Sequence, residues 1–185
     1  MTNKEKRNLE IIRHKSNAKD CGGNGRAFEL ECVRDGSRKT KISKQGEKDV
    51  SVKILRNGRP DYAPAECKTN GGRIETLLNG TNKAEFVIYR LETVQKHKAT
   101  KNRPEWVEER VVPPVIIPVH LFVKMVVECN AYKVASHNQV EDGIQLQPSS
   151  KKMFLRLTAY TENYPDMIFD NKKVFEDWQF EGLEL

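Results

Sequence analysis

The dipeptide Asn57-Gly58 constrains the fold of this 185-residue chain more than any other local feature. Asparagine and glycine tolerate the positive φ angles that a two-residue type I′ hairpin turn requires. If these two residues form the turn, every residue before it pairs with a defined residue after it, and Asp49 lies directly opposite Glu66. The sequence therefore predicts a hairpin that brings two carboxylates together.

Side chains alternate between the two faces of a strand, so this register also sorts the neighbouring residues. Asp49, Glu66 and Lys68 are predicted to share one face. The opposite face is apolar and suits a core: Val50, Val52, Ile54, Ala65 and Cys67. A bulge at Pro60 or Pro64 would reverse this assignment, because one extra residue turns every later side chain over.

Two acids that face each other across a hairpin destabilise it unless something offsets the repulsion. A divalent metal ion is one candidate for that role. Lys68 is another, because its ammonium group can neutralise Asp49 and Glu66 in a purely structural ion cluster. The residues alone leave both interpretations open.

The charge balance favours an anionic partner. The net charge is +6 and the sequence pI is about 9.1, which suits nucleic acid better than a membrane. Much of the excess lies near the N-terminus: Lys4, Lys6, Arg7, Arg13, His14, Lys15 and Lys19. Such residues are expected to contact phosphates without reading bases, although a basic stretch is often only a solvated face.

Cysteine usage and hydropathy point to a cytoplasmic protein. Cys21, Cys32, Cys67 and Cys129 have no C-x-x-C spacing and are expected to be reduced, partly buried thiols. The charged N-terminus does not resemble a secretory signal. The longest apolar stretch, residues 111–127, is interrupted by prolines and charges and is not expected to span a bilayer.

The periodicity predicts a single α+β domain over residues 1–185. Helices are expected at 3–17, 26–34 and 73–78, and strands at 39–43, 48–55, 62–68 and 84–91. The order from residue 24 to 91 is helix, three strands, helix and strand. Asn79-Gly80 is expected to end the last of these helices.

The second half of the chain is predicted in less detail, as a C-terminal extension over residues 92–185. Residues 93–109 are expected to form a polar loop or arm, residues 118–129 a helix and residues 152–160 a strand. The helix would pack through Leu121, Phe122, Met125 and Val126. The tail aromatics are expected to dock the C-terminus rather than stack on bases: Phe169, Phe175, Trp178 and Phe180.

The order of elements and acids resembles the PD-(D/E)XK nuclease superfamily, whose core is an α-β-β-β-α-β unit. The resemblance covers residues 25–91 and rests on three stretches: Gly25-Arg26-Ala27-Phe28-Glu29, Lys48-Asp49-Val50 and Ala65-Glu66-Cys67-Lys68. It implies a restriction-endonuclease-like fold with a mixed central sheet flanked by helices. The family's proline does not precede Asp49, and Pro60-Asp61 is not the metal-binding acid because Asp61 and Glu66 would point to opposite faces.

The resemblance implies a Mg²⁺- or Mn²⁺-dependent endonuclease that hydrolyses DNA, with RNA as a further possible substrate. The implied metal ligands are Asp49, Glu66 and the backbone carbonyl of Cys67, with Glu29 as a further acid and Glu31 as its substitute. Lys68 would orient or deprotonate the attacking water, or stabilise phosphate charge. The expected nucleic-acid contacts are Asn70, Arg73, Lys15 and Arg26.

Two interpretations from other classes remain. The chain can be a non-catalytic DNA-binding module on a nuclease fold, or a small basic adaptor for an acidic protein. The Gly22-Gly23-Asn24-Gly25 stretch lacks the preceding strand of a dinucleotide-binding loop, and the four histidines have no metal spacing. A homodimer would suit cleavage of two strands.

Overall fold

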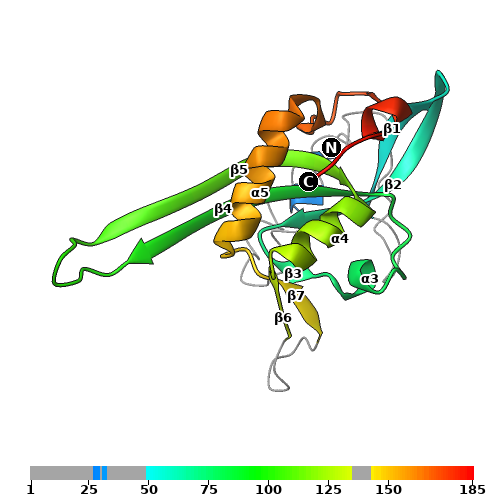
Figure 1. The fold of residues 1–185 in the computed structure, drawn as a ribbon. Helices are drawn as coiled ribbons and strands as arrows, with labels where there is room; N and C mark the ends of the chain where they lie inside the picture. The colour runs from blue at the N-terminus through cyan, green and yellow to red at the C-terminus, as the bar shows by residue number, and fades with distance from the viewer. Residues whose placement is uncertain (1–26, 30, 33–48, 135–142) are drawn as a thin grey trace, which may run out of the picture.

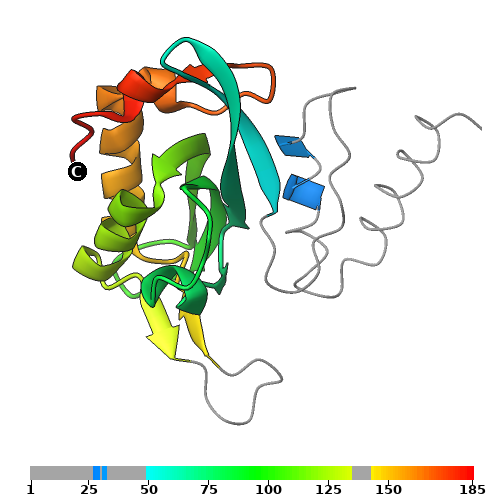
Figure 2. The same ribbon diagram turned by 90° about the vertical axis from the view of Figure 1, so that its right-hand side faces the viewer.

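A curled, mixed five-stranded sheet organises the protein. The computed structural model describes residues 27–29, 31–32, 49–134 and 143–185. The strand order is β5-β4-β2-β1-β8, and a second sheet has the order β3-β7-β6. Figure 1 shows β4 and β5 continuing well beyond the body as an arm, and Figure 2 shows α4 and α5 on one side of the central sheet with the N-terminal helical residues (blue) on the other.

The two sheets are built from eight strands in the described part of the chain, and short helices connect or cover them. Residues 27–29 and 31–32 are helical. The strands are β1 (Val50–Arg56), β2 (Arg59–Thr69), β3 (Gly72–Arg73), β4 (Phe86–His97), β5 (Trp106–Pro118), β6 (Tyr132–Val134), β7 (Ile144–Leu146) and β8 (Phe175–Glu176). The helices are α3 (Glu75–Leu78), α4 (Val119–Glu128), α5 (Lys151–Asn163) and the short 3-10 turns η1 (Pro165–Met167) and η2 (Asp177–Phe180).

The predicted hairpin and its register are confirmed. β1 and β2 pair antiparallel from Val50 opposite Ala65 to Arg56 opposite Arg59, without a bulge at either proline. Asn57 and Gly58 have φ angles of 50° and 75°, as a type I′ turn requires. The whole predicted apolar face is buried, together with Ala63.

β2 also pairs with β4, and this pairing is parallel, with Glu66 beside Val87 and Lys68 beside Tyr89. A parallel pair needs a crossover between its strands, and residues 70–85 supply it with β3 and α3. α3 ends as predicted, because Gly80 takes a φ angle of 72° just beyond the C-cap residue Asn79. This crossover returns the chain beside the strand that carries Glu66 and Lys68.

Helix α4 begins directly after Pro118, as predicted. Its buried residues are Leu121, Phe122, Met125 and Val126, the predicted packing face. Phe122 packs obliquely on Tyr89 of β4 with the ring centroids 5.5 Å apart. Of the helices in the described part of the chain, none is long and apolar enough to cross a lipid bilayer.

The prediction of a strand at residues 152–160 is wrong, because this segment lies within α5. Ser150 caps the helix by accepting a hydrogen bond from the backbone N–H of Met153. Met153, Leu157 and Tyr160 are buried at the i, i+4, i+7 spacing of one helix face. The short apolar run had the composition of a strand but the periodicity of a helix.

The prediction of a loop over residues 93–109 is wrong in its secondary structure but right in describing an arm. The β4–β5 ladder continues to His97 opposite Trp106, with a register shift between Tyr89 and Leu91. Beyond the body both faces of this hairpin are largely polar, so the alternation that marks a half-buried strand is absent. The arm is a two-stranded ribbon.

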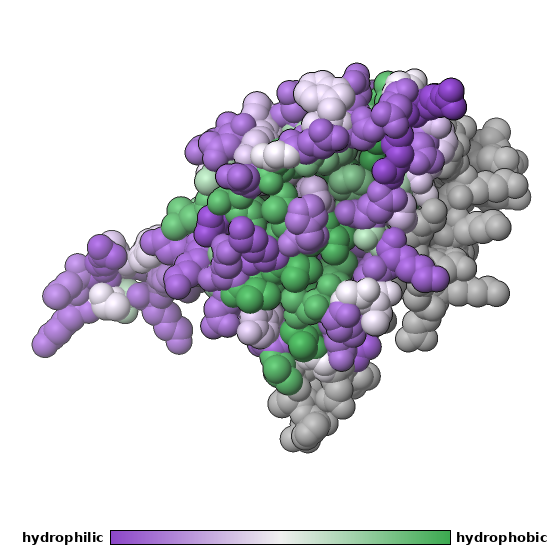
Figure 3. All heavy atoms as spheres, turned by 45° about the vertical axis from the view of Figure 1, so that its right-hand side comes forward, coloured by the Kyte–Doolittle hydropathy of each residue, from purple (hydrophilic) through white to green (hydrophobic). Residues whose placement is uncertain are grey.

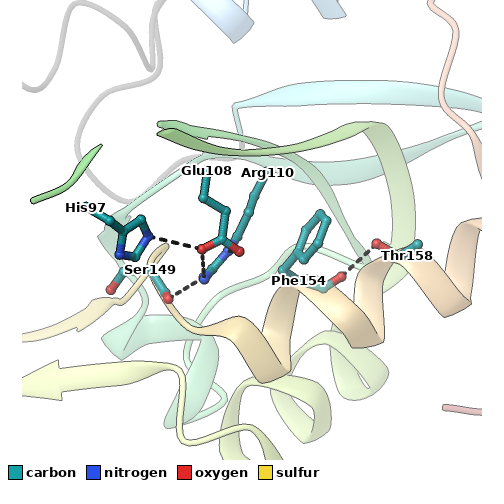
Figure 4. A network of polar contacts seen from close by, with 6 residues as sticks. All are labelled: His97, Glu108, Arg110, Ser149, Phe154 and Thr158. Atoms are coloured by element: carbon teal, nitrogen blue, oxygen red, sulfur yellow. Dashed lines mark hydrogen bonds and ion pairs between the residues drawn. The ribbon is translucent and has the colours of Figure 1, made fainter. Parts of the chain in front are cut away.

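Arg110 anchors the base of this arm and is the one charged residue among the buried side chains of the described chain. Its guanidinium donates to Glu108 and to the backbone carbonyl of Ser149, which precedes α5. His97 lies 3.3 Å from the same Glu108 carboxylate, as Figure 4 shows. The network ties both strands of the arm to the start of α5.

The tail aromatics dock onto the core with one exception. Phe175 is fully buried, and its ring is near those of Phe169 and Phe180. Phe180 also lies 4.4 Å from Phe86, centroid to centroid. Trp178 is 61% exposed and does not follow the prediction. Residues 92–185 therefore complete the central sheet through β5 and β8.

We expect Arg110→Ala to lower the free energy of unfolding by about 2 kcal/mol, because a buried stem and a buried hydrogen bond to Ser149 are both lost. The hydrogen bond from Arg110 is the main cause of the lowered Glu108 pKa, so that pKa should rise toward its ordinary value. Denaturant titration and carboxyl titration by NMR measure the two effects.

Arg156 supplies the control, since its ion pair with Glu128 is at the surface. Arg156→Ala should change the free energy of unfolding by no more than about 0.5 kcal/mol. Equal effects of the two substitutions would contradict the anchoring role of Arg110.

Candidate functional site

The candidate site lies where the β1–β2 hairpin opens. Asp49 directly precedes β1, and Glu66 and Lys68 lie on β2. The paired register ends at Val50 opposite Ala65, one residue before Asp49, and the charge of Glu66 raises the pKa of Asp49, so these two side chains lie close together. The structure brings the three side chains close together, since Lys68 pairs with Glu66 and the charges of both act on the pKa of Asp49. Whether both carboxylates can reach one metal ion stays a prediction.

Asp49 is held by the backbone of the neighbouring strand. The Cys67 N–H donates to Asp49 Oδ2 at 2.9 Å. In an antiparallel pair the N–H and C=O of one residue point to the same edge of the strand, so the Cys67 carbonyl also points to the edge where Asp49 lies. This orientation agrees with the predicted role of that carbonyl as a ligand.

The carboxylate of Asp49 is strongly perturbed. Burial, followed by the charge of Glu66, raises its pKa from 3.8 to about 7. Glu29 adds to the increase, whereas the Cys67 N–H and the Lys68 ammonium oppose it. An acid that is only half ionised near neutral pH is typical of functional sites.

Glu66 and Lys68 form a tight, largely buried ion pair. Lys68 Nζ lies 2.6 Å from Glu66 Oε1, and the side chains are 16% and 13% exposed. An ammonium group has three donors, so this bond leaves two for other acceptors. The pair is consistent with either a catalytic lysine or a structural ion cluster.

Asn82 also contacts the site, although it was not among the residues predicted to do so. Its Nδ2 lies 3.4 Å from Glu66 Oε2 and 3.3 Å from Thr76 Oγ1. Its Oδ1 accepts from the N–H of Ala84. Asn82 follows the Asn79-Gly80 helix end, where an asparagine is expected for turn formation alone, so the sequence carries no separate signal for this contact.

The helical residues 27–29 bring Glu29 close enough for its charge to raise the pKa of Asp49. Phe28 is buried in the core and lies under the Arg90 guanidinium, 4.5 Å from ring centroid to Cζ. Glu31, the substitute for Glu29, is instead paired with Arg90 at 2.7 Å. The structure thus favours Glu29 over Glu31 as the further acid.

Cys67 connects this helix to the site strand. Its side chain hydrogen-bonds to that of Cys32, and burial raises the pKa of the Cys67 thiol. Cys32, Cys67 and Cys129 are free and buried, as predicted for reduced thiols. Cys21 lies outside the described residues.

The four residues predicted to contact nucleic acid do not form one group in the structure. The side chain of Asn70 accepts a hydrogen bond from the Glu92 N–H at 2.7 Å, and the backbone carbonyl of Asn70 accepts one from the Tyr89 hydroxyl. Asn70 therefore joins the end of β2 to β4. Arg73 is exposed on β3, where its side chain and that of Glu75 lie against Gly143. Several predictions lie outside the described residues. They concern Lys15, Arg26 and the other N-terminal basic residues, the helix expected at 3–17 and the strand expected at 39–43.

Asp61, the acid that follows Pro60, lies away from the site, as predicted. It pairs with Arg56 near the exposed tip of the hairpin. By alternation it shares its face with Cys67 rather than with Glu66.

The donor set suits a hard cation such as Mg²⁺, which accepts oxygen ligands and keeps several waters, so that one or two carboxylates suffice. Within the described residues, no group of three or more His, Cys, Asp and Glu side chains is arranged to hold a metal ion. The candidate set is therefore two carboxylates and a carbonyl.

No protein-family model, curated protein or solved structure matches this chain. The candidate site rests on its own geometry.

The raised pKa of Asp49 predicts a pH-dependent cost of folding. The unfolded chain ionises Asp49 near 3.8 and the folded chain near 7, so between these values the folded state holds the extra proton and its stability falls as pH rises. Asp49→Asn removes this titration and keeps an acceptor for the Cys67 N–H. We expect the stability of this variant relative to the parent to increase by on the order of 2 kcal/mol between pH 5 and pH 8.

Chemical denaturation at several pH values measures this difference. Asp61→Asn, at the exposed end of the same hairpin, is the control and should follow the parent at a constant offset. A constant offset for Asp49→Asn as well would show that Asp49 is not perturbed.

Proposed function

We propose that the protein is a metal-dependent endonuclease of the PD-(D/E)XK type that hydrolyses DNA phosphodiester bonds. The observation that carries the proposal is the cluster of Asp49, Glu66 and Lys68, in which the Lys68 ammonium lies 2.6 Å from Glu66 and burial raises the pKa of Asp49. Burial of two acids and a lysine at a strand opening is costly for stability alone, and such perturbed clusters concentrate at functional sites.

The arrangement of elements supports the same proposal. A helix that carries Glu29 precedes an antiparallel β1–β2 pair, and a crossover with α3 leads to β4 parallel to β2. In the α-β-β-β-α-β unit the acid lies on the second strand and the E-x-K on the third, which would make β1 and β2 those strands. The first strand of such a unit would fall in the undescribed residues 33–48.

Asp49, Glu66 and the Cys67 carbonyl would hold a Mg²⁺ or Mn²⁺ ion, with Glu29 nearby. The cation would supply Lewis acidity to the phosphoryl group and the attacking water. Lys68 would use its remaining donors to orient that water or to stabilise charge on the phosphate oxygens. Asn82 would fix the Glu66 carboxylate through Oε2, opposite the oxygen that Lys68 contacts.

A non-catalytic DNA-binding module is the second candidate. The short Lys68–Glu66 contact is consistent with it, because this ion pair can compensate the Glu66 charge without a metal ion. The two functions differ in metal dependence, since only the nuclease needs a divalent ion to act.

Cleavage assays with Mg²⁺ or Mn²⁺ test the proposal on supercoiled, linear, branched and single-stranded DNA. Asp49→Asn, Glu66→Gln and Lys68→Met should each lower the cleavage rate by about a hundredfold or more, because each removes a metal ligand or a donor to the phosphate. Calorimetry should show weakened Mn²⁺ binding in the two carboxylate variants and retained binding in Lys68→Met.

Asp61→Asn is the matched control and should cleave like the parent, because Asp61 lies on the other face of β2. Parent-like cleavage by all three site variants would show that the site is misassigned. Metal-independent DNA binding without cleavage of any substrate would favour the binding module.

A further inference from the structure

The tip of the β4–β5 arm carries four cations and a single acid, the exposed Glu105. Residues 96–104 include Lys96, Lys98, Lys101 and Arg103, all exposed, and no aspartate or glutamate. Within the described chain the structure shows no ion pair for these four cations. Figure 3 shows this tip as a mainly hydrophilic projection that stands away from the body. Unpaired, clustered cations of this kind suit a run of phosphates.

An aromatic platform adjoins these cations. The His97 and Trp106 rings stack with their centroids 4.0 Å apart and their planes within 6°. Trp106 remains 41% exposed, although a tryptophan is among the most costly side chains to leave in water. Two contacts support the stack: the ladder pairs His97 with Trp106, and the Glu108 carboxylate lies 3.3 Å from His97 Nε2.

An open hollow of about 350 Å³ lies on this platform, lined by Arg103, Pro104 and Trp106. Its lining combines the side chains of a tryptophan, a proline and an arginine. A nucleobase can stack on the indole and on the guanidinium plane while the neighbouring lysines contact its phosphates. An acidic protein would need only the charges and would not account for the exposed stack.

We propose that the tip of the arm is a nucleic-acid contact site that binds an unpaired nucleotide segment by stacking a base on Trp106 and pairing the adjoining phosphates with Lys98, Lys101 and Arg103. The site is separate from the candidate active site: about ten β4 residues lie between Val87, beside Glu66, and His97, which places the tip up to about 30 Å away. The inference takes its class of partner from the proposed function but needs no cleavage.

Tryptophan fluorescence tests the stacking directly, because the chain contains only Trp106 and Trp178. In a Trp178→Phe variant, Trp106 is the sole reporter. A thymidine oligonucleotide of about 20 nucleotides, added in EDTA to prevent cleavage, should quench this fluorescence. A Trp106→Phe variant, which reports only from exposed Trp178, should show no quenching.

Affinity measurements test the two kinds of contact. Trp106→Ala should weaken oligonucleotide binding by about fivefold to a hundredfold, as expected for one stacked base. The combined variant Lys98→Gln, Lys101→Gln and Arg103→Gln should lower the log–log salt slope by about 2, since each single-strand phosphate contact contributes about 0.7.

The matched control neutralises two lysines and one arginine on α4 and α5, Lys124, Lys152 and Arg156, and should leave both the quenching and the slope unchanged. Both measurements are made in EDTA without cleavage, so failure of the active-site proposal and failure of this one are distinguishable.

The proposal would be overturned if the arm variants bound the oligonucleotide with the affinity and salt slope of the parent. It would also be overturned if the oligonucleotide quenched the fluorescence equally with and without Trp106. If the same variants instead changed the sedimentation of the protein alone, the arm would be a contact between copies of this chain. The exposed Val94, Val107 and Val111 on the arm would then form part of that contact.

Discussion

The candidate site depends on one constraint, the register of the β1–β2 hairpin. The Asn57-Gly58 turn sets that register, and side chains alternate strictly along both strands, so a shift by one residue would move Glu66 and Lys68 into the core and Cys67 out of it. The buried face of Val50, Val52 and Ile54 opposes such a shift with its apolar area. The core thereby maintains the positions of the charged residues.

The same register creates an electrostatic conflict that the protein relieves only in part. Glu66 is compensated by Lys68 and Asn82, whereas Asp49 has a backbone N–H from Cys67 and a pKa raised to about 7. A folded state that tolerates such a carboxylate has not optimised this region for stability alone. A ligand that neutralises Asp49 would stabilise the fold as it binds.

The local turn chemistry and the core faces could be predicted from the sequence because each depends on near neighbours. Asn57-Gly58, Asn79-Gly80 and the buried face of α4 are of this kind. The contact between Asn82 and Glu66 could not be predicted, because it depends on how the crossover through α3 returns to β2. The strands of the arm could not be predicted from sequence periodicity either, since a polar ribbon outside the core has no buried face and so no alternation of apolar and polar residues.

α5 was mispredicted although its signal was present. Ser150 and the spacing of Met153, Leu157 and Tyr160 indicate a capped amphipathic helix, but the apolar residues between them obscured the period. The role of Arg110 needed coordinates as well, because its partner at Ser149 lies 39 residues further along the chain. Long-range contacts of charged residues leave no local pattern.

The position of β8 has a consequence for the order in which the protein can fold during synthesis. β8 pairs in parallel with β1 at the edge of the central sheet, and Phe175 and Phe180 join the core that contains Ile54 and Phe86. A ribosome that has just released the β1–β2 hairpin must add more than a hundred further residues before this edge can be covered. Until then this edge of β1 stays unpaired, so the core around Ile54 and Phe86 can be completed only late in translation.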